Sequence, residues 1–212
     1  MAESHNMIVD HVVFVVADPV KATRDLFDEY GLGSERGPYH TFSGTRNWSV
    51  PLTPPCYLEL LSIEDRHVAE SSKPGRRVIE CEEAGGGLLT WAILVEEVQV
   101  FSQRLGIEIF DYTKRDENGT LRGWRSVSGP PHLLFFIDWP NNEGRLQRWQ
   151  NMYNRVGHKC APGGFSILTI SGSERVMRGW IGPHGLPLRF VEGARGLVGA
   201  RIATAAGEVV IA

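Results

Sequence analysis

Hydrophobic residues fall into short runs that alternate with amphipathic stretches. The run at 8–16, IVDHVVFVV, is rich in β-branched residues and ends before Asp18 and Pro19, which predicts a strand followed by a capped helix. Apolar residues in the next stretch share one helical face, and Gly31 and Gly33 end it. Further strands are predicted at about 39–43, 46–52 and 57–63. The first part of the chain therefore predicts the order β-α-β-β-β.

The same order returns from residue 88. A strand, LLTWAILV, precedes a helix that ends at Gly106, and strands follow near 107–113, 121–127 and 133–138. A connection follows at 139–164. The pattern then returns in shorter form, with strands predicted at FSILTIS, PLRFVEG, GLVGARIAT and EVVIA and a helix start at Ser173. The predicted fold class is α+β with repeated βαβββ modules. We expect two modules, at about 8–63 and 88–138, within residues 1–140, and a connection plus a shorter third β-rich module, packed on the same domain, in residues 141–212.

The composition is that of a globular protein. A net charge of −3 and 22% charged residues indicate no basic surface for nucleic acid. Three widely spaced cysteines, Cys56, Cys81 and Cys160, predict neither a disulfide framework nor a thiolate zinc site, and they favour a reducing compartment. The N-terminal residues do not read as a signal peptide, and no apolar window approaches the length of a membrane span. We therefore expect a cytoplasmic protein with no nucleic-acid or membrane partner.

A histidine near the start of the first strand is the first candidate for chemistry. If the fourth strand lies beside the first, in the order 1-4-3-2, His11 and Glu59 come from neighbouring strands and their side chains meet on one face. An imidazole and a carboxylate in this arrangement provide half of a site for a divalent metal ion. A simple His–Glu hydrogen bond between two half-buried groups is an equal alternative.

The second module offers fewer metal ligands. Thr90 corresponds to His11, because each lies seven residues before the expected N-cap of the following helix, Glu97 and Asp18 respectively. Trp91 follows Thr90. On the last strand of this module, only Asp138 is a convincing ligand, and an inward-facing Asp138 would favour metal chemistry. Trp91 opposite His11 would instead favour binding without catalysis.

Other residues are candidates for contact with a small molecule. In a flat sheet His40 lies about 14 Å from the first strand, so a role as acid, base or substrate contact is favoured over a shared metal. The segment Arg46, Asn47 and Trp48 offers a guanidinium, an amide and an indole to a ligand. Trp91 is a candidate for an aromatic wall, and His132 precedes the last strand of the second module. Turn, core and surface roles are the alternatives for these residues.

Three motifs together resemble one known family. The chain resembles the glyoxalase-like branch of the vicinal oxygen chelate superfamily in the stretches DHVVFVVADPVKATRDLFDEYGLG, YHTFSGTRNWSVPL and YLELLSIED. In the second half, FFIDW resembles the matching strand of this branch. The resemblance implies curved mixed sheets, built from paired βαβββ modules, around a cup that binds small molecules. It also implies that His11 and Glu59 are metal ligands, with Glu59 also acting in catalysis. In the second half of the chain, Trp91 and FFID stand where the family has metal ligands, so this half departs from the family's pattern.

Two functional hypotheses follow from the resemblance and the candidate residues. The first is a glyoxalase-like protein that binds and transforms a small carbonyl- or enediol-bearing molecule, assisted by one divalent metal ion. An enzyme of this kind would be a lyase, an isomerase or a dioxygenase. The second is a non-catalytic protein that sequesters a small molecule in the same cup. Association into a homodimer is a further hypothesis.

Overall fold

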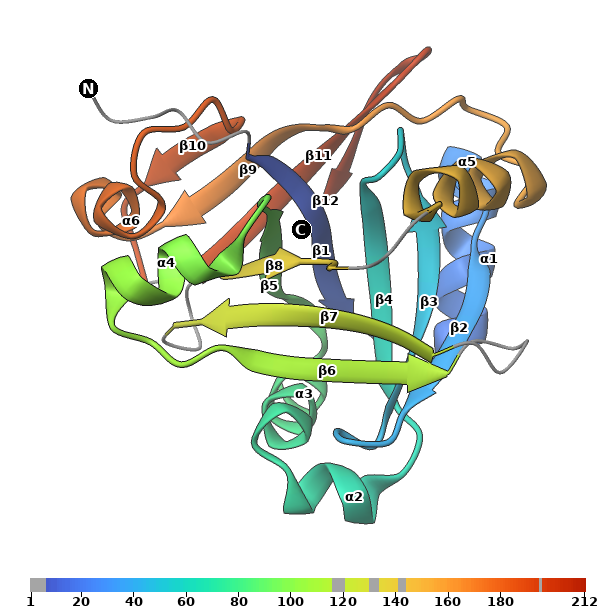
Figure 1. Ribbon diagram of the computed structural model, residues 1–212. Coiled ribbons are helices and arrows are strands. Elements are labelled where there is room, and N and C mark those ends of the chain that lie inside the picture. The colour runs from blue at the N-terminus through green and yellow to red at the C-terminus, as the bar shows by residue number, and fades with distance from the viewer. Residues whose placement is uncertain (1–6, 116–120, 130–133, 141–143, 195) are drawn as a thin grey trace.

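A strongly curled sheet of eight strands forms the centre of the molecule (Figure 1). The computed structural model describes residues 7–115, 121–129, 134–140, 144–194 and 196–212. The strand order is β2-β3-β4-β1-β5-β8-β7-β6, so each half of the sheet comes from one continuous part of the chain. The prediction of repeated βαβββ modules in an α+β fold is confirmed.

The first module begins where the hydrophobic pattern places it. The Asp18 side chain accepts a hydrogen bond from the Lys21 N–H at 2.9 Å, Pro19 starts the helix, and Gly31 ends it with a φ of 70°. This module consists of β1 (Ile8–Val15), α1 (Pro19–Tyr30), β2 (Glu35–His40), β3 (Thr45–Pro51) and β4 (Tyr57–Ile63). The predicted strand order 1-4-3-2 is present.

The second module repeats these elements and their order. It consists of β5 (Gly87–Leu94), α4 (Val98–Leu105), β6 (Phe110–Arg115), β7 (Leu121–Ser128) and β8 (Phe135–Asp138). In each module the last strand is parallel to the first, whereas β1 and β5 pair in antiparallel fashion. The modules are therefore related by an approximate two-fold rotation about the β1–β5 contact.

The C-terminal segment forms a second sheet with a different topology. It contains β9 (Phe165–Ser171), α6 (Glu174–Ile181), β10 (Leu188–Val191), β11 (Gly196–Thr204) and β12 (Gly207–Ile211). The sheet order is β10-β9-β11-β12, with β9 parallel to β10. In the two modules the first strand pairs with the last strand, whereas here the first strand, β9, lies between β10 and β11 and away from the last strand, β12. The strand pairing of this segment therefore differs from that of the modules.

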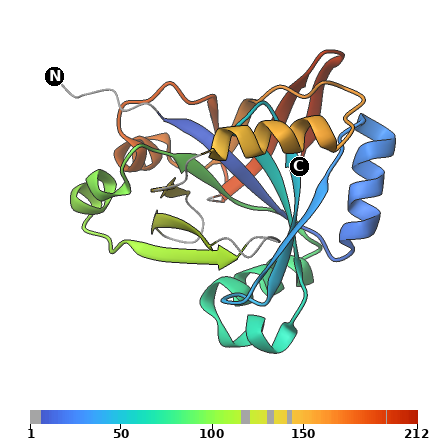
Figure 2. The same ribbon diagram turned by 45° about the vertical axis from the view of Figure 1, so that its right-hand side comes forward.

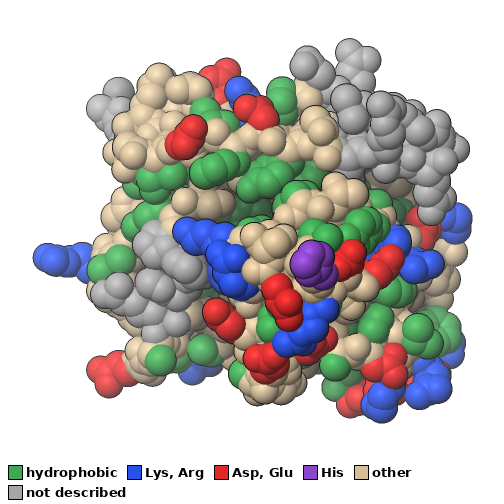
Figure 3. Space-filling view, turned by 90° about the horizontal axis from the view of Figure 1, so that it is seen from below, with side chains coloured by type: hydrophobic (Ala, Val, Ile, Leu, Met, Phe, Trp, Pro, Cys, Tyr) green, Lys and Arg blue, Asp and Glu red, His purple; other side chains and the backbone are tan. Residues whose placement is uncertain are grey.

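Three helices lie outside the predicted elements. They are α2 (Arg66–Ser71), α3 (Lys73–Glu83) and α5 (Arg145–Arg155). The pair α2 and α3 connects the two modules and lies at the lower end of the curled sheet, and α5 lies near its upper end (Figures 1 and 2). The charged side chains of α2 and α3 make these helices hard to recognise from hydrophobic periodicity. Figure 3 shows acidic and basic groups mixed on this side of the molecule, where Arg66 pairs with Glu70 and Glu83.

One large apolar cluster joins both sheets. Val12 and Trp91 belong to it from the eight-stranded sheet, and Leu168 and Ile202 belong to it from the four-stranded sheet. A smaller cluster on the opposite face of β1 includes Val13, Val15, Leu61 and Val78. Val78 comes from α3, so this helix packs on the concave side of the sheet. Within the described ranges no helix is long and apolar enough to cross a membrane.

Replacement of Trp91 by alanine tests its assignment to the core. The Trp91 side chain is only 1% exposed, so we expect Trp91→Ala to lower the free energy of unfolding by about 3–5 kcal/mol, measured by urea denaturation. Val210 is 54% exposed, and the control Val210→Ala should change this free energy by less than about 0.5 kcal/mol. A Trp91→Ala protein as stable as the wild type would contradict the assignment.

Candidate functional site

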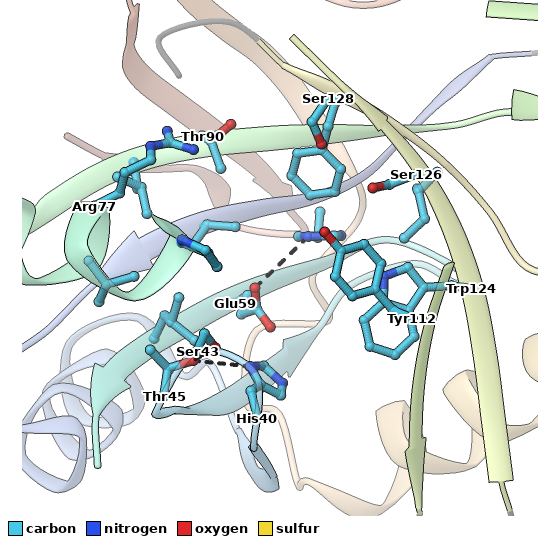
Figure 4. Close-up of a pocket in the computed structure, with 18 of the residues that line it drawn as sticks. His40, Ser43, Thr45, Glu59, Arg77, Thr90, Tyr112, Trp124, Ser126 and Ser128 are labelled. Carbon is cyan, nitrogen blue, oxygen red and sulfur yellow. Dashed lines mark hydrogen bonds and ion pairs between the residues drawn. The ribbon is translucent and has the colours of Figure 1, made fainter. Parts of the chain in front are cut away.

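A cavity of about 210 Å³ lies on the concave side of the curled sheet. Strands of both modules and helix α3 form its walls, so neither module encloses it alone. Figure 4 shows side chains of both modules pointing into this space. The polar and charged side chains that line it are His11, His40, Ser43, Thr45, Glu59, Arg77, Thr90, Ser126 and Ser128.

A buried chain of charged groups fixes the His11 ring. The His11 Nδ1 atom lies 2.8 Å from an oxygen of Asp10, which is completely buried, and the other Asp10 oxygen accepts a hydrogen bond from Arg145. Burial acts to raise the pKa of the Asp10 carboxyl, but the Arg145 charge and the bond to His11 outweigh it and hold that pKa below its usual value. Asp10 is therefore an ionised acceptor, and His11 donates to it through Nδ1–H.

The bond to Asp10 directs the other ring nitrogen of His11 into the cavity. His11 Nε2 lies 3.9 Å from an oxygen of Glu59, a side chain that is largely buried, and a neutral ring that donates through Nδ1–H presents its lone pair at this atom. The His11 ring also stacks on Tyr57 with centroids 4.6 Å apart, and Tyr57 in turn stacks on Trp149 of α5 at 4.3 Å. These contacts hold the imidazole in one orientation. The structure thus brings the two predicted residues together.

His11 and Glu59 reach the same point but form only part of a metal site. Two metal–ligand bonds of about 2.1 Å span up to about 4.2 Å, so one ion between these side chains contacts both. A catalytic zinc site takes three protein ligands. Among the described residues no group of three or more His, Cys, Asp or Glu side chains is arranged to hold a metal ion. The His, Cys, Asp and Glu side chains of the described residues therefore do not provide all the ligands of a complete metal site.

The two-fold relation of the modules explains the missing ligands. Val13 of β1 pairs with Glu59 of β4, and its counterpart Ala92 of β5 pairs with Phe135 of β8. Phe135 therefore stands in the place of Glu59, and its ring contacts the edge of the His11 ring with centroids 5.4 Å apart. Thr90 stands in the place of His11. The second module contributes a hydroxyl and an aromatic ring where the first contributes an imidazole and a carboxylate.

Asp138, the ligand expected from the second module, has a structural role instead. Its carboxylate accepts hydrogen bonds from the Val98 N–H at the start of α4, at 2.9 Å, and from Arg125. It is buried and does not line the cavity. Glu97, the residue before α4, makes no side-chain cap, and the Asp138 carboxylate supplies this function from a neighbouring strand.

The curl of the sheet brings His40 to the cavity despite its place on the edge strand β2. Its Nδ1 atom lies 3.2 Å from the Thr45 hydroxyl, and its ring stacks with Phe42 at 5.7 Å. Figure 4 shows His40 and Glu59 pointing into the same space. His40 and His11 thus line the same cavity although two strands lie between β2 and β1, because the sheet is curled rather than flat.

Aromatic rings close the cavity where the two edges of the sheet meet. Phe42 of the first module contacts Tyr112 of β6 with centroids 5.1 Å apart, and Tyr112 stacks on Trp124 at 5.3 Å. Trp139 continues the row, 5.4 Å from Trp124. This aromatic wall, consisting of Phe42, Tyr112, Trp124 and Trp139, gives one side of the cavity an apolar surface.

The other predicted contact residues do not line this cavity. Arg46 forms an ion pair with Glu64 and donates to the Gly37 carbonyl. Trp48 lies beside Arg36 and packs against the core, and Asn47 is buried next to Ser49. Strand alternation directs Arg46 and Trp48 to the face opposite Thr45.

Trp91 and His132 are the two remaining residues that the sequence predicted as contacts for a small molecule. Trp91 packs in the core on the face of β5 opposite Thr90, so the predicted aromatic contact with a ligand does not arise at the cavity. His132 lies outside the described residues. Sequence reasoning did not single out Asp10 as a positioning group, nor Arg145, Tyr57 or Arg77. The Asp-His dipeptide was a local signal for the first of these, whereas the other three reach the site only through tertiary contacts.

The curled sheet of paired βαβββ modules around a cavity defines a protein of the vicinal oxygen chelate type. The model of the glyoxalase-like domain family matches residues 9–175, and the chain therefore belongs to this family. A comparison with curated proteins finds no match for this chain.

Solved structures share the fold at low sequence identity. A hypothetical protein from Staphylococcus aureus is 13% identical, covers 90% of this chain and 88% of its own, and has a TM-score of 0.66. A selenomethionine form of a methylmalonyl-CoA epimerase is 15% identical, covers 66% of this chain and 100% of its own, and has a TM-score of 0.50. At these identities the similarity concerns the fold.

Replacement of Asp10 tests its position between His11 and Arg145. Asp10→Asn leaves the buried Arg145 charge uncompensated, so we expect the free energy of unfolding to fall by about 3 kcal/mol. In the wild type, ¹⁵N NMR should show neutral His11 with its proton on Nδ1, and this preference should weaken in the variant. The control Asp28→Asn changes an exposed residue of α1. Equal stability and tautomer populations in wild type and Asp10→Asn would contradict this account.

Proposed function

We propose that this protein binds a small carbonyl- or enediol-bearing molecule in the cavity and transfers a proton at the carbon beside the carbonyl group. The observation that carries this proposal is the position of His11 Nε2 in the cavity, 3.9 Å from an oxygen of Glu59, while Asp10 holds Nδ1. An imidazole base next to a carboxylate, in a cavity closed by aromatic rings, is suited to proton abstraction.

Each cavity residue has a distinct part in this chemistry. His11 accepts the proton through Nε2, and the carboxylates of Asp10 and Glu59 stabilise the imidazolium that forms. The oxygen of the enediolate then needs hydrogen-bond donors, which the hydroxyl of Thr90 and the ring of His40 supply from other walls. Return of the proton to the same carbon regenerates the molecule and exchanges its proton with solvent. Delivery of the proton to the former carbonyl carbon completes an isomerisation, in which the hydroxyl proton moves to the enediolate oxygen and the other oxygen becomes the new carbonyl.

The expectation of one divalent metal ion at His11 and Glu59 stays a prediction. These two side chains can share an ion, and an ion there would polarise a carbonyl oxygen as a Lewis acid. Metal analysis of the purified protein, compared with His11→Ala, tests this role. Equal and negligible metal in both proteins would remove it.

A non-catalytic binding protein is the second candidate. Phe135 and the aromatic wall favour it, because both present apolar surface to a bound molecule. The two candidates differ in one measurable property. A sequestering protein binds its ligand without exchanging the ligand's protons with solvent.

Deuterium exchange distinguishes these candidates. Hydroxyacetone, glyceraldehyde and pyruvate in D₂O serve as probes, and ¹H NMR measures loss of the protons beside the carbonyl. We expect wild-type protein to accelerate exchange of at least one probe, and His11→Ala to slow it by about 10²–10⁴-fold. Glu59→Gln should also slow it, because it removes the charge that stabilises the imidazolium.

The matched control is His67→Ala, which removes an exposed histidine of α2 away from the cavity. This variant should exchange the probe at the wild-type rate. Binding of a probe without exchange would favour the sequestering protein. Exchange that survives in His11→Ala would overturn the assigned base.

A further inference from the structure

Helix α3 brings to the cavity a charged group that neither module supplies. Arg77 lines the cavity together with Pro74 and Val78 of the same helix. Thr90 of β5 lines the same cavity, and Figure 4 shows both side chains. The preceding residue, Arg76, is exposed instead and donates to the Glu70 carbonyl at 3.0 Å. Two adjacent arginines therefore have opposite environments, and only Arg77 faces the site.

The wall around Arg77 favours the arrival of an anion. Val78 and Leu89 make part of this wall apolar, which limits the solvation of the guanidinium. Burial lowers the pKa of Arg77 more than the nearby Glu80 and Cys81 raise it. An anion that enters the cavity is thus attracted to Arg77 more strongly than it would be in water.

The cavity has opposite charges on different elements. Glu59 projects from β4 beside His11, whereas Arg77 projects into the cavity from α3 (Figure 4). A molecule with one anionic end is repelled by Glu59 and attracted by Arg77, so it enters in one orientation. A planar carboxylate matches the guanidinium, which donates two parallel hydrogen bonds to it.

We propose that Arg77 binds a carboxylate group of the substrate, so that the protein acts on a small carboxylic acid with a carbonyl group next to the reacting carbon. This inference rests on the proposed function, whose base is His11. With the carboxylate on Arg77, the carbonyl lies near Thr90 and the reacting carbon faces His11 and Glu59. Helix α3 thereby determines which molecules enter a cavity built by the two modules.

Matched pairs of ligands test the charge requirement. The probes are pyruvate, 2-oxobutanoate and 4-methyl-2-oxopentanoate, each paired with its neutral primary amide, which has almost the same shape. Titrations followed by NMR give the dissociation constants. We expect at least one carboxylate to bind the wild type about tenfold more tightly than its amide, as charge-assisted hydrogen bonds do relative to neutral ones. Arg77→Gln should abolish this preference.

Two further variants separate charge recognition from a general effect on the fold. Arg76→Gln removes the neighbouring exposed charge and should retain the wild-type preference. Arg77→Lys keeps the charge without the paired geometry and should give an intermediate ratio. Thermal unfolding of each variant verifies that the cavity is folded at the temperature of the titration.

The proposal is overturned if the carboxylates and amides bind the wild type equally, if none of the carboxylates binds, or if the preference survives in Arg77→Gln. Failure of the proposed function gives a different result. In that case the carboxylates bind with the expected preference, but the protons beside their carbonyl groups do not exchange with D₂O. Exchange without a preference for carboxylates would retain His11 as the base and remove only the role of Arg77.

Discussion

The antiparallel pairing of β1 with β5 is the contact on which the site depends. It joins two four-stranded halves edge to edge, so that a single curled sheet has a concave side shared by both modules. Residues His11 and Val13 face this side from β1, and Thr90 faces it from β5. Any shift of register by one residue would turn these side chains into the core and expose Val12 and Trp91 to the cavity.

The approximate two-fold relation of the modules makes their differences informative. His11 and Glu59 of the first module correspond to Thr90 and Phe135 of the second. The backbone is repeated, but the chemistry is not. The first module holds the ionisable pair, and the second lines the cavity with hydroxyls and aromatic rings. Arg77, from the helices that connect them, gives the cavity its positive charge.

Elements outside the two modules also support the His11 ring. Arg145, at the start of α5, compensates the charge of Asp10, and Trp149 on the same helix stacks on Tyr57. Tyr57 lies between that tryptophan and the His11 ring. Burial raises the pKa of the Tyr57 hydroxyl well above its usual value, so Tyr57 stays neutral beside Glu59. A helix that follows the second module thus fixes the imidazole of the first.

The sequence alone determined the repeated order of strands and helices in the two modules, because each of these elements carries its own periodicity and is bounded by local turn or cap residues. Asp18 and Ser173 cap helices at the expected places, and His11 and Glu59 lie side by side once β4 pairs with β1. The helix of residues 145–155 was not predicted, although Leu146, Trp149 and Tyr153 recur at helical spacing, because the whole stretch at 139–164 was interpreted as a connection.

Only the tertiary structure decided what surrounds the His11–Glu59 pair. Asp138 turned out to cap a helix, and His40 reached the cavity through the curl of the sheet. Arg77 and Arg145 came to the site from segments far away in the chain. Local patterns indicate whether a residue lies in a strand or a helix. The curvature of the sheet and the docking of helices on it determine which of these residues meet, because those contacts join positions that no local pattern relates.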